Sequence, residues 1–492
     1  MKPSTLGRRA VALALTTALH AAPLAAADAA PADSLRLSLR QALDLALDLN
    51  PSVQGARVAT RIQARALAAE GARFGRSLTA QVSHQADRSP SISSLESVET
   101  ATSSVLSTSA GISQELVSGG RLGLSFSNSR YSSNAAYRII DPVYDSGLSL
   151  EYTQPLLQGR GAVNRTGREV ARNDLAIADA DLEEQVRDLT AQVSGAYWDL
   201  YFALEKLQVQ RQLEEGARRV LETVRTRAEM GAEARTAILQ AEVGVARRDQ
   251  ELVSAEGAVR QAEDQLRALL GLDRDRAQWQ SRLVPTSAPE LAPFDGDLGA
   301  GVEAALLSSP AFRRAEIQVQ SLDLQAALAR DRTRPEVNLS AQVGLTGIGG
   351  TYGDDLDGLS HADGRTWRGG LSLQVPLGQS ADQERYRQRL LEKERGQIDL
   401  ERLRLAIVQQ VREQYRLVEI NRRASEVADL VVRLARQNVA EEEQRLSLGL
   451  STVRQVLDAQ DELAQSRVAS LSAVVDYNRA LAEWTRLTGE ER

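Results

Sequence analysis

The apolar positions between residues 182 and 207 repeat with the spacing of a coiled coil. Leucine, valine and tyrosine recur there at intervals of three and four residues, and residues 252–269 carry a second stripe of this kind that is rich in alanine. Such stripes give a helix one apolar face that packs against other helices. We therefore expect packing surfaces here, and we interpret the aromatic cluster Tyr197-Trp198-Asp199-Leu200-Tyr201 as a packing layer between helices and not as a ligand site.

The predicted helices are much longer than a globular domain needs. Residues 161–230 contain no proline and would extend about 105 Å as a helix, while 51–73 and 232–270 would nearly match that length end to end. In the second half, residues 381–445 would extend about 98 Å beside two shorter segments, 310–329 and 451–488. Each half is thus predicted to contain one long helix beside two shorter helices stacked in line.

Between the short and the long helix of each half, the apolar period changes to two. Leu148, Leu150 and Tyr152 alternate with polar residues, and so do Leu371, Leu373 and Val375. The first half has room for four strands, at about 78–88, 103–117, 121–132 and 146–154, with a turn signal at Gly119-Gly120. Such alternation fits either a membrane barrel with lipid outside and water inside or a half-buried sheet of a soluble protein. Two stretches rich in Ser, Thr, Gly and Asp are predicted to be exposed loops, about Ser89–Ser109 and Gly349–Asp363.

The two halves of the chain repeat one another. Residues 230–271 match 448–489 without a gap at several apolar, alanine and glycine positions, and Ala46, Leu47 and Pro51 reappear as Ala305, Leu306 and Pro310. Repetition at this scale indicates two copies of one structural unit. We predict a first repeat over 28–272 with strands in 76–157, a linker over 273–297, and a second repeat over 298–492 with strands in 336–377.

The N-terminus predicts export. Lys2, Arg8 and Arg9 precede an apolar run and then several alanines, which is the pattern of a secretory signal peptide over residues 1–27. The chain has no cysteine, so it forms neither disulfides nor a lipid attachment at a cysteine. No later segment reaches about 18 continuous apolar residues, so we expect any membrane insertion to use a closed barrel of strands.

The sequence offers little chemistry for catalysis. Neither His84 nor His361 has metal-ligand spacing, and no phosphate-binding loop or nucleophile constellation stands out. We therefore expect no enzymatic activity, no cofactor, no metal and no nucleic-acid partner.

Three motifs carry a resemblance to a known family. They are the strand end Tyr152-Thr153-Gln154-Pro155 with the following Leu-Leu-Gln-Gly, its partner Val375-Pro376-Leu377-Gly378, and the turn Leu448-Gly449-Leu450-Ser451 followed by Val456-Leu457-Asp458-Ala459-Gln460. In this order, over residues 39–489, the chain resembles the TolC-like outer-membrane efflux proteins. The resemblance implies an α+β membrane protein in which a homotrimer forms an outer-membrane β-barrel continuous with a long periplasmic α-helical barrel.

The resemblance also implies partners and a location. Members of this family lie in the outer membrane, contact its lipid and extend into the periplasm. They are passive exit ducts that work with a periplasmic membrane-fusion adaptor and a proton-driven or ATP-driven inner-membrane pump, in tripartite efflux or in type I secretion. The substrate class stays open because the inner-membrane partners choose it. A periplasmic coiled-coil scaffold without a pore is the alternative, but it leaves the predicted strands unexplained.

In the family, the helix-turn-helix tips face the periplasm, contact the adaptor and close the channel like an iris. The tip positions here are Met230, Gly231, Ala232, Leu448, Gly449, Leu450 and Ser451. Two family aspartates at the constriction match Gln455 and Asp458, and Asp461 and Glu462 follow one turn later. Asp458 alternatively stabilises the first turn of its helix through the helix dipole. The family's basic and tyrosine latch positions align with Ser451 and Leu446, so that latch is not carried over.

The first half departs from the family pattern of two strands per half. Its additional hairpin, at Gly119-Gly120, either adds two strands to the barrel or folds as a periplasmic flap. The sequence favours added strands.

Overall fold

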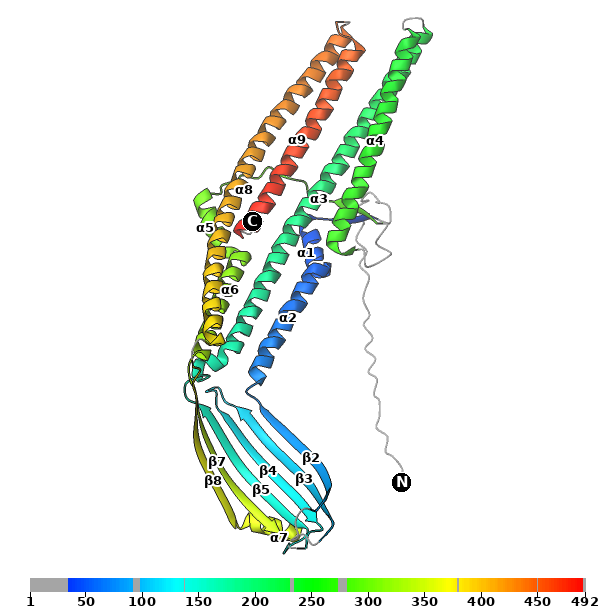
Figure 1. Ribbon diagram of the computed structural model, residues 1–492. Helices are drawn as coiled ribbons and strands as arrows, with labels where there is room; N and C mark the ends of the chain where they lie inside the picture. Colours follow the sequence, from blue (N-terminus) through cyan, green and yellow to red (C-terminus); the bar gives the residue numbers. More distant parts are fainter. Residues whose placement is uncertain are drawn as a thin grey trace, which may run out of the picture.

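The computed structural model describes residues 34–91, 98–136, 138–230, 234–272, 281–377, 380–448 and 450–489. The predicted signal peptide lies outside these residues. A layer of long helices stands on one twisted antiparallel sheet (Figure 1). The helices are α1 (Leu39–Leu49), α2 (Pro51–Ala72), α3 (Thr166–Glu229), α4 (Arg235–Leu270), α5 (Leu298–Ser308), α6 (Pro310–Arg332), α7 (Tyr352–Ser360), α8 (Ala381–Ser447) and α9 (Val453–Thr488).

Helix lengths agree with the prediction from the sequence. Helix α3 has 64 residues and α8 has 67, which correspond to about 96 and 100 Å. None of the helices in the described part of the chain is long and apolar enough to cross a membrane.

The shorter helices are stacked in line, as predicted. Asn50 caps α2 by accepting a hydrogen bond from the Ser52 amide at 2.8 Å, and its side-chain amide donates to the Leu269 carbonyl at the end of α4, also at 2.8 Å. In the second half, the Ser308 hydroxyl donates to the Thr488 carbonyl at 2.8 Å and so joins the α5–α6 junction to the end of α9. One polar side chain at each junction therefore joins a short helix to the returning helix of its own half.

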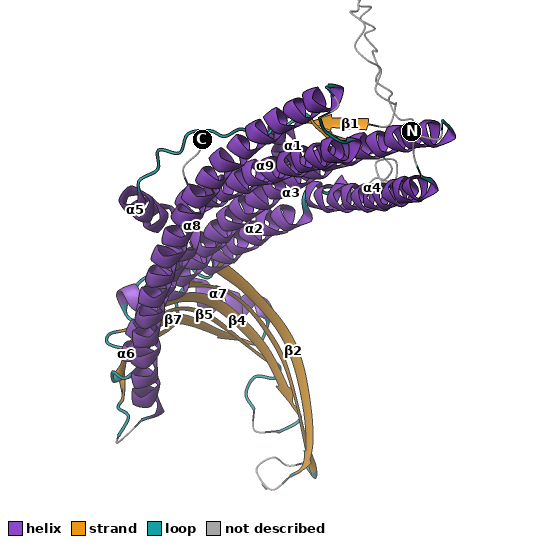
Figure 2. Cartoon of the chain, turned by 90° about the horizontal axis from the view of Figure 1, so that it is seen from above, coloured by secondary structure: helices purple, strands orange, loops and turns teal. Residues whose placement is uncertain are grey.

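Four helical columns lie side by side in a curved layer (Figures 1 and 2). Near the sheet the order is α2, α3, α6, α8, and away from the sheet it is α4, α3, α9, α8. The predicted stripe lies inside this layer, with Leu189, Val193 and Leu200 almost fully buried. One edge of the layer is therefore formed by α2 and α4, and the other by α8.

The predicted aromatic layer lies at mid-height and packs as expected. Tyr197 is fully buried, and its hydroxyl donates to the Leu37 carbonyl at 3.0 Å and accepts from the Ser287 amide at 2.8 Å. These bonds hold a parallel pair of short strands against α3, formed by β1 (Ser34–Leu37) and β6 (Arg282–Pro285).

The large sheet has six antiparallel strands in the order β2, β3, β4, β5, β7, β8. All four strands predicted in the first half are present. The strands are β2 (Arg76–Pro90), β3 (Thr100–Glu115), β4 (Arg121–Ser133), β5 (Val143–Pro155), β7 (Glu336–Gly349) and β8 (Gly364–Gln374).

Three boundary predictions were wrong. Much of the predicted loop 89–109 is strand, because small polar residues occupy one face of the sheet without disturbing the ladder between β2 and β3. The predicted loop 349–363 contains α7, which Thr351 caps by accepting a hydrogen bond from the Asp354 amide at 3.2 Å. Residues 161–165 form a 3₁₀ turn, η2 (Gly161–Arg165), before α3 begins.

Candidate channel gate at the hairpin tips

The α3–α4 and α8–α9 hairpins end at the pole of the molecule opposite the sheet (Figure 1). Three apolar side chains are exposed there: Met230 by 71%, Leu448 by 66% and Leu450 by 69%. The predicted tip residues Gly231, Ala232 and Gly449 lie outside the described residues. Each tip thus presents apolar surface to the solvent without a partner from the described part of the chain.

A reciprocal capping box begins α9. The Gln455 amide donates to the Thr452 hydroxyl at 3.3 Å, and the Thr452 amide donates to the Gln455 side-chain oxygen at 2.9 Å. The Ser451 hydroxyl donates to Glu442 of α8 at 2.5 Å and lies 3.1 Å from the side-chain oxygen of Gln455. The side chain of Gln455, a predicted constriction residue, is therefore engaged in capping the helix.

Asp458 and Glu462 lie on an open face of α9. Val456 and Ala459 are buried, whereas the side chain of Asp458 is 72% exposed and Glu462 is exposed. The nearest cation to Asp458 is Arg454, one turn earlier, at 3.9 Å. An exposed pair at this distance is weak, so the Asp458 side chain is open to solvent.

Asp461, three residues later, has a different environment. It forms an ion pair with Arg248 of α4, and Arg248 also contacts Glu251 at 2.8 Å. Burial raises the pKa of Asp461; Arg248 opposes this effect, whereas Asp458 and Glu251 add to it. The fold thus divides the predicted acidic residues between an exposed position and a contact between the two hairpins.

Three arginine–aspartate pairs join the two hairpins along their length. Arg486 and Arg479 of α9 pair with Asp188 and Asp199 of α3, and Arg248 pairs with Asp461. The Arg248–Asp461 pair is nearest the tips, and among the described residues no ion pair joins the hairpins beyond it. Figure 1 shows the hairpins diverging toward their tips.

No pattern in the sequence indicated a role for Arg248. Its partner lies 213 residues away, and it is one of many arginines along the long helices. Glu442, which contacts Ser451 across the α8–α9 turn, was not predicted either. By contrast, the Thr-x-x-Gln pattern at 452–455 is a recognisable capping signal.

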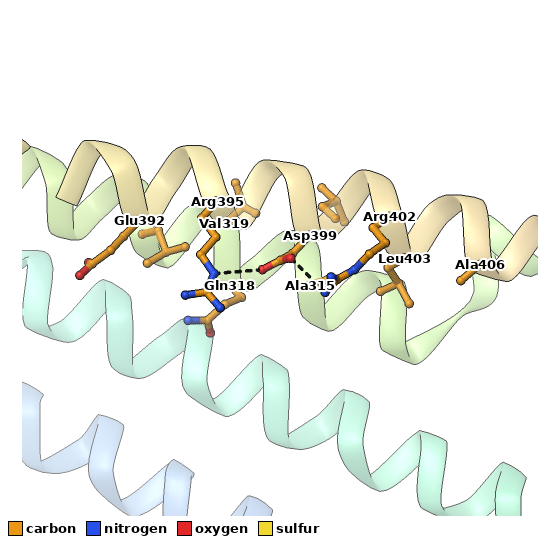
Figure 3. A pocket seen from close by; sticks show the side chains of 12 residues that line it. Ala315, Gln318, Val319, Glu392, Arg395, Asp399, Arg402, Leu403 and Ala406 are labelled. Carbon is orange, nitrogen blue, oxygen red and sulfur yellow. Dashed lines mark ion pairs between the residues drawn. The ribbon is translucent and has the colours of Figure 1, made fainter. Parts of the chain in front are cut away.

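The α8 edge of the layer is grooved. A groove of about 620 Å³ between α6 and α8 has apolar walls that include Val319, Leu322 and Leu403 (Figure 3). At its rim Asp399 lies 3.8 Å from Arg395 and 3.0 Å from Arg402. A second groove, of about 600 Å³, lies between α8 and α9 and includes Val427 and Val431.

Two long segments of the chain, which include both helical hairpins and part of the antiparallel sheet, match the sequence model of a known family. The sequence model of the outer membrane efflux protein family matches residues 121–272 and 301–490, well over half of the chain. The chain belongs to the outer membrane efflux protein family. It is an efflux-channel protein of the outer membrane that extends into the periplasm.

Solved structures of outer-membrane proteins share its fold. CmeC of Campylobacter jejuni is 14% identical with a TM-score of 0.68, and the match covers 92% of this chain and 85% of that one. VceC of Vibrio cholerae is 16% identical, with a TM-score of 0.66 and coverage of 92% and 96%. MtrE of Neisseria gonorrhoeae, in its open state, is 19% identical, with a TM-score of 0.65 and coverage of 92% and 88%. No curated protein matches the chain.

Proposed function

We propose that three copies of this chain form the exit duct of a tripartite export system, either a drug-efflux pump or a type I secretion system. The strands form a barrel in the outer membrane, and the helices form a periplasmic tunnel that closes like an iris at its tips. Solutes or polypeptides pass through passively. The energy comes from an inner-membrane pump driven by protons or by ATP.

The observation on which this proposal rests is that the helical layer and the sheet share their edges. Helix α2 and strand β2 lie at one edge, and α8 and β8 lie at the other. Strand β2 follows α2 directly and forms one edge of the sheet, whereas β8 leads into α8 and forms the other. A chain with two different open edges assembles head to tail, and a curved layer closes into a ring. A soluble scaffold would leave both edges of the sheet unpaired.

The α2 edge carries exposed apolar side chains, and the α8 edge carries an apolar groove at the same distance from the sheet. Val58 and Ile62 of α2 are 50% and 59% exposed, about 15 to 21 Å from the end of α2 near the sheet. The α6–α8 groove begins at Glu392, about 16 Å from the corresponding end of α8. We place the α2 of one copy against this groove of the next, with α4 against the second groove.

At the tips, exposed Met230, Leu448 and Leu450 form an apolar surface suited to the helical hairpins of a periplasmic adaptor. Arg248 and Asp461 form the closing contact of the gate. Among the described residues, this is the ion pair between the hairpins that lies nearest the tips. Without it, the ion pairs that remain between the hairpins all lie farther from the tips, and the tip of the α8–α9 hairpin is free to move. Asp458 from three copies forms an acidic ring in the throat.

Single-channel recording of the purified protein in planar bilayers tests the proposal. We expect the wild-type protein to be trimeric and to give discrete conductance steps. Arg248→Ala removes the inter-hairpin pair and should raise the mean conductance or the open fraction at least twofold. A charge swap, Arg248→Asp with Asp461→Arg, should restore the closed behaviour.

Arg225→Ala provides the matched control, because Arg225 pairs with Glu242 at 2.9 Å within the α3–α4 hairpin and does not bridge the two hairpins. It should leave the conductance near the wild-type value. A monomeric protein without conductance would overturn the proposal that the chain forms an exit duct. A conducting trimer that responds equally to Arg248→Ala and Arg225→Ala would overturn only the assignment of the gate.

A further inference from the structure

The first half contains one hairpin more than the second. From the sequence, the Gly119-Gly120 turn marked the additional hairpin. The family model, however, begins to match only at Arg121, the first residue of β4, so the strands of the first half that lie outside the match are β2 and β3. The additional strands are therefore β2 and β3, which have 15 and 16 residues. They are as long as the other strands of the sheet, so they are able to span the same membrane thickness.

The additional hairpin continues both faces of the sheet. The register aligns one apolar row across all six strands: Leu78, Ile112, Leu124, Leu150, Val343, Trp367. The adjacent row on the opposite face consists of small or hydroxyl-bearing residues: Thr79, Gly111, Ser125, Ser149, Gly344, Thr366. A hairpin with one lipid-compatible face and one water-compatible face, both in register with its neighbours, belongs to the membrane wall and not to a periplasmic flap.

Contacts at the base of the hairpin fix it at the junction with the helices. Arg73, at the end of α2, pairs with Glu115 at 2.9 Å, and the Gln114 side chain donates to the Phe74 carbonyl at 3.1 Å. On the other side, the Gly161 amide donates to the Ser118 carbonyl at 3.0 Å. The hairpin therefore rises from the same level as β4 and β5.

Strands β2 and β8 are the edge strands of the sheet, each with a neighbour on one side only, and the exposure of their side chains reflects this. On the apolar face, Leu78 of β2 is 75% exposed and Leu371 of β8 is 67% exposed, whereas Leu124 and Leu150 in the middle of the sheet are 45% and 42% exposed. Strand β2 runs away from the helices and β8 runs toward them, so the two edges meet antiparallel when one copy joins the next. Closure then preserves the alternation of strand directions around the ring.

We propose that three copies of the chain close an eighteen-stranded outer-membrane barrel through β2–β8 pairing, with a lumen wide enough for a helical hairpin of polypeptide. This inference rests on the trimer of the proposed function. With strands about 4.8 Å apart and tilted by about 40°, eighteen strands give a backbone diameter of about 36 Å, against about 24 Å for twelve.

The helical layer supports the wider barrel. Four helical columns per chain give twelve around a trimeric tunnel, and at about 10 Å between axes their circumference is about 120 Å. Eighteen tilted strands have a circumference of about 113 Å, whereas twelve have only about 75 Å. With the additional hairpin, the barrel and the tunnel meet at almost the same width.

The diameter of the barrel lumen limits the size of the polypeptide that can pass. Subtracting about 5 Å for side chains on each side leaves a lumen of about 26 Å for eighteen strands and about 14 Å for twelve. A single helix with its side chains is about 10 to 12 Å wide. The wider lumen therefore passes two helices side by side, whereas the narrower one passes only one.

Removal of residues 76–117 tests this inference. Gly75 then continues into Ser118-Gly119-Gly120, three residues that span the roughly 10 Å from the end of α2 to the start of β4. Electron cryomicroscopy of detergent-solubilised trimers counts the strands of both proteins. In bilayers, polyethylene glycols of graded size, added only on the extracellular side, measure the barrel independently of the gate.

We expect eighteen strands in the wild-type trimer and twelve in the deletion variant, with the largest polymer that enters falling from about 26 to about 14 Å in diameter. A wild-type trimer with twelve strands around the pore and the hairpin elsewhere would overturn the inference and leave the exit-duct proposal intact. Equal polymer cut-offs for the two trimers would also overturn it. Absence of any trimeric pore would instead reject the proposed function. The wild-type strand count decides the question even if the deletion variant does not assemble.

Discussion

Asp458 and Asp461 are three residues apart on α9, but the fold gives them different surroundings. Asp458 is solvent-exposed with a weak partner, whereas Asp461 lies against Arg248 of the neighbouring hairpin. One carboxylate therefore faces solvent, and the other forms a contact between the two hairpins. Each assignment gives a separate prediction.

In the proposed trimer, Asp458→Asn removes three carboxylates from the throat. Because a ring of like charges attracts counter-ions, we expect the cation-to-anion permeability ratio to fall at least twofold. Reversal potentials in a salt gradient measure this ratio. Glu401→Gln, an exposed acid on α8 about 70 Å from the tips, should have little effect. Unchanged selectivity in Asp458→Asn would reject the ring.

Acid is expected to weaken the Arg248–Asp461 contact. Burial raises the pKa of Asp461, so it takes up its proton at a higher pH than an exposed aspartate, whose pKa is about 3.9. Since the folded-state pKa lies above the unfolded-state value, ionisation of Asp461 costs stability near neutral pH, and protonation relieves that cost as the pH falls. Protonation of Asp461 also removes its electrostatic attraction to Arg248, and this loss weakens the contact.

Recording between pH 7 and pH 4.5 measures this effect. The open fraction of the wild-type channel should rise as the pH falls, and Asp461→Asn should be more open already at pH 7 and respond less. An identical pH response in the two proteins would mean that another group controls it.

Among the elements, the β3–β4 turn packs closely against the segment that joins β5 to α3. Gly119 has a φ of +92°, and a Cβ atom there would press against the carbonyl oxygen of Gly159. The turn thus depends on glycine for both its backbone conformation and its close packing. The two sides of the junction fit only while this position has no side chain.

Gly119→Ala should destabilise the protein by about 2 to 3 kcal/mol, because it combines backbone strain with a clash against backbone. Thermal dissociation of the trimer, followed by gel mobility, measures the loss. Gly123→Ala is the control, since a Cβ atom at Gly123 meets nothing within 4 Å. Similar melting of the two variants would contradict the importance of this turn.

At the scale of the whole molecule, the proposed ring depends on complementary edges. Val58 and Ile62 occupy the middle of the α2 edge at the height of the α6–α8 groove. Because the two side chains are already about half buried, their complete burial between copies contributes about 1.5 to 3 kcal/mol per interface. The trimer should therefore be sensitive to charge at these two positions.

The double change Val58→Asp and Ile62→Asp should shift the protein from trimer toward monomer, as measured by light scattering in detergent or by native mass spectrometry. Ile139→Asp is the control, because Ile139 is fully exposed in the β4–β5 connection, away from both helical edges. A stable trimer in the double variant would contradict the proposed placement of α2.

Much of the element pattern could be predicted from the chain. Heptad spacing predicted α3 and α4, and alternation together with the length of the segment predicted four strands in the first half. These signals are local, because apolar periodicity and caps act over a few residues. Helix α7 was missed because its short acidic sequence also fits a loop.

Which distant residues meet depends on the fold. The fold paired Arg248 with Asp461. It also placed β2 at a free edge, with its apolar residues in register with those of the other strands. Ion pairs between residues hundreds of positions apart leave no periodic trace in the chain, and strand register depends on the neighbouring strands. The helices and strands thus follow from local sequence signals, whereas the free edges of the sheet and the contacts between the hairpins depend on the fold.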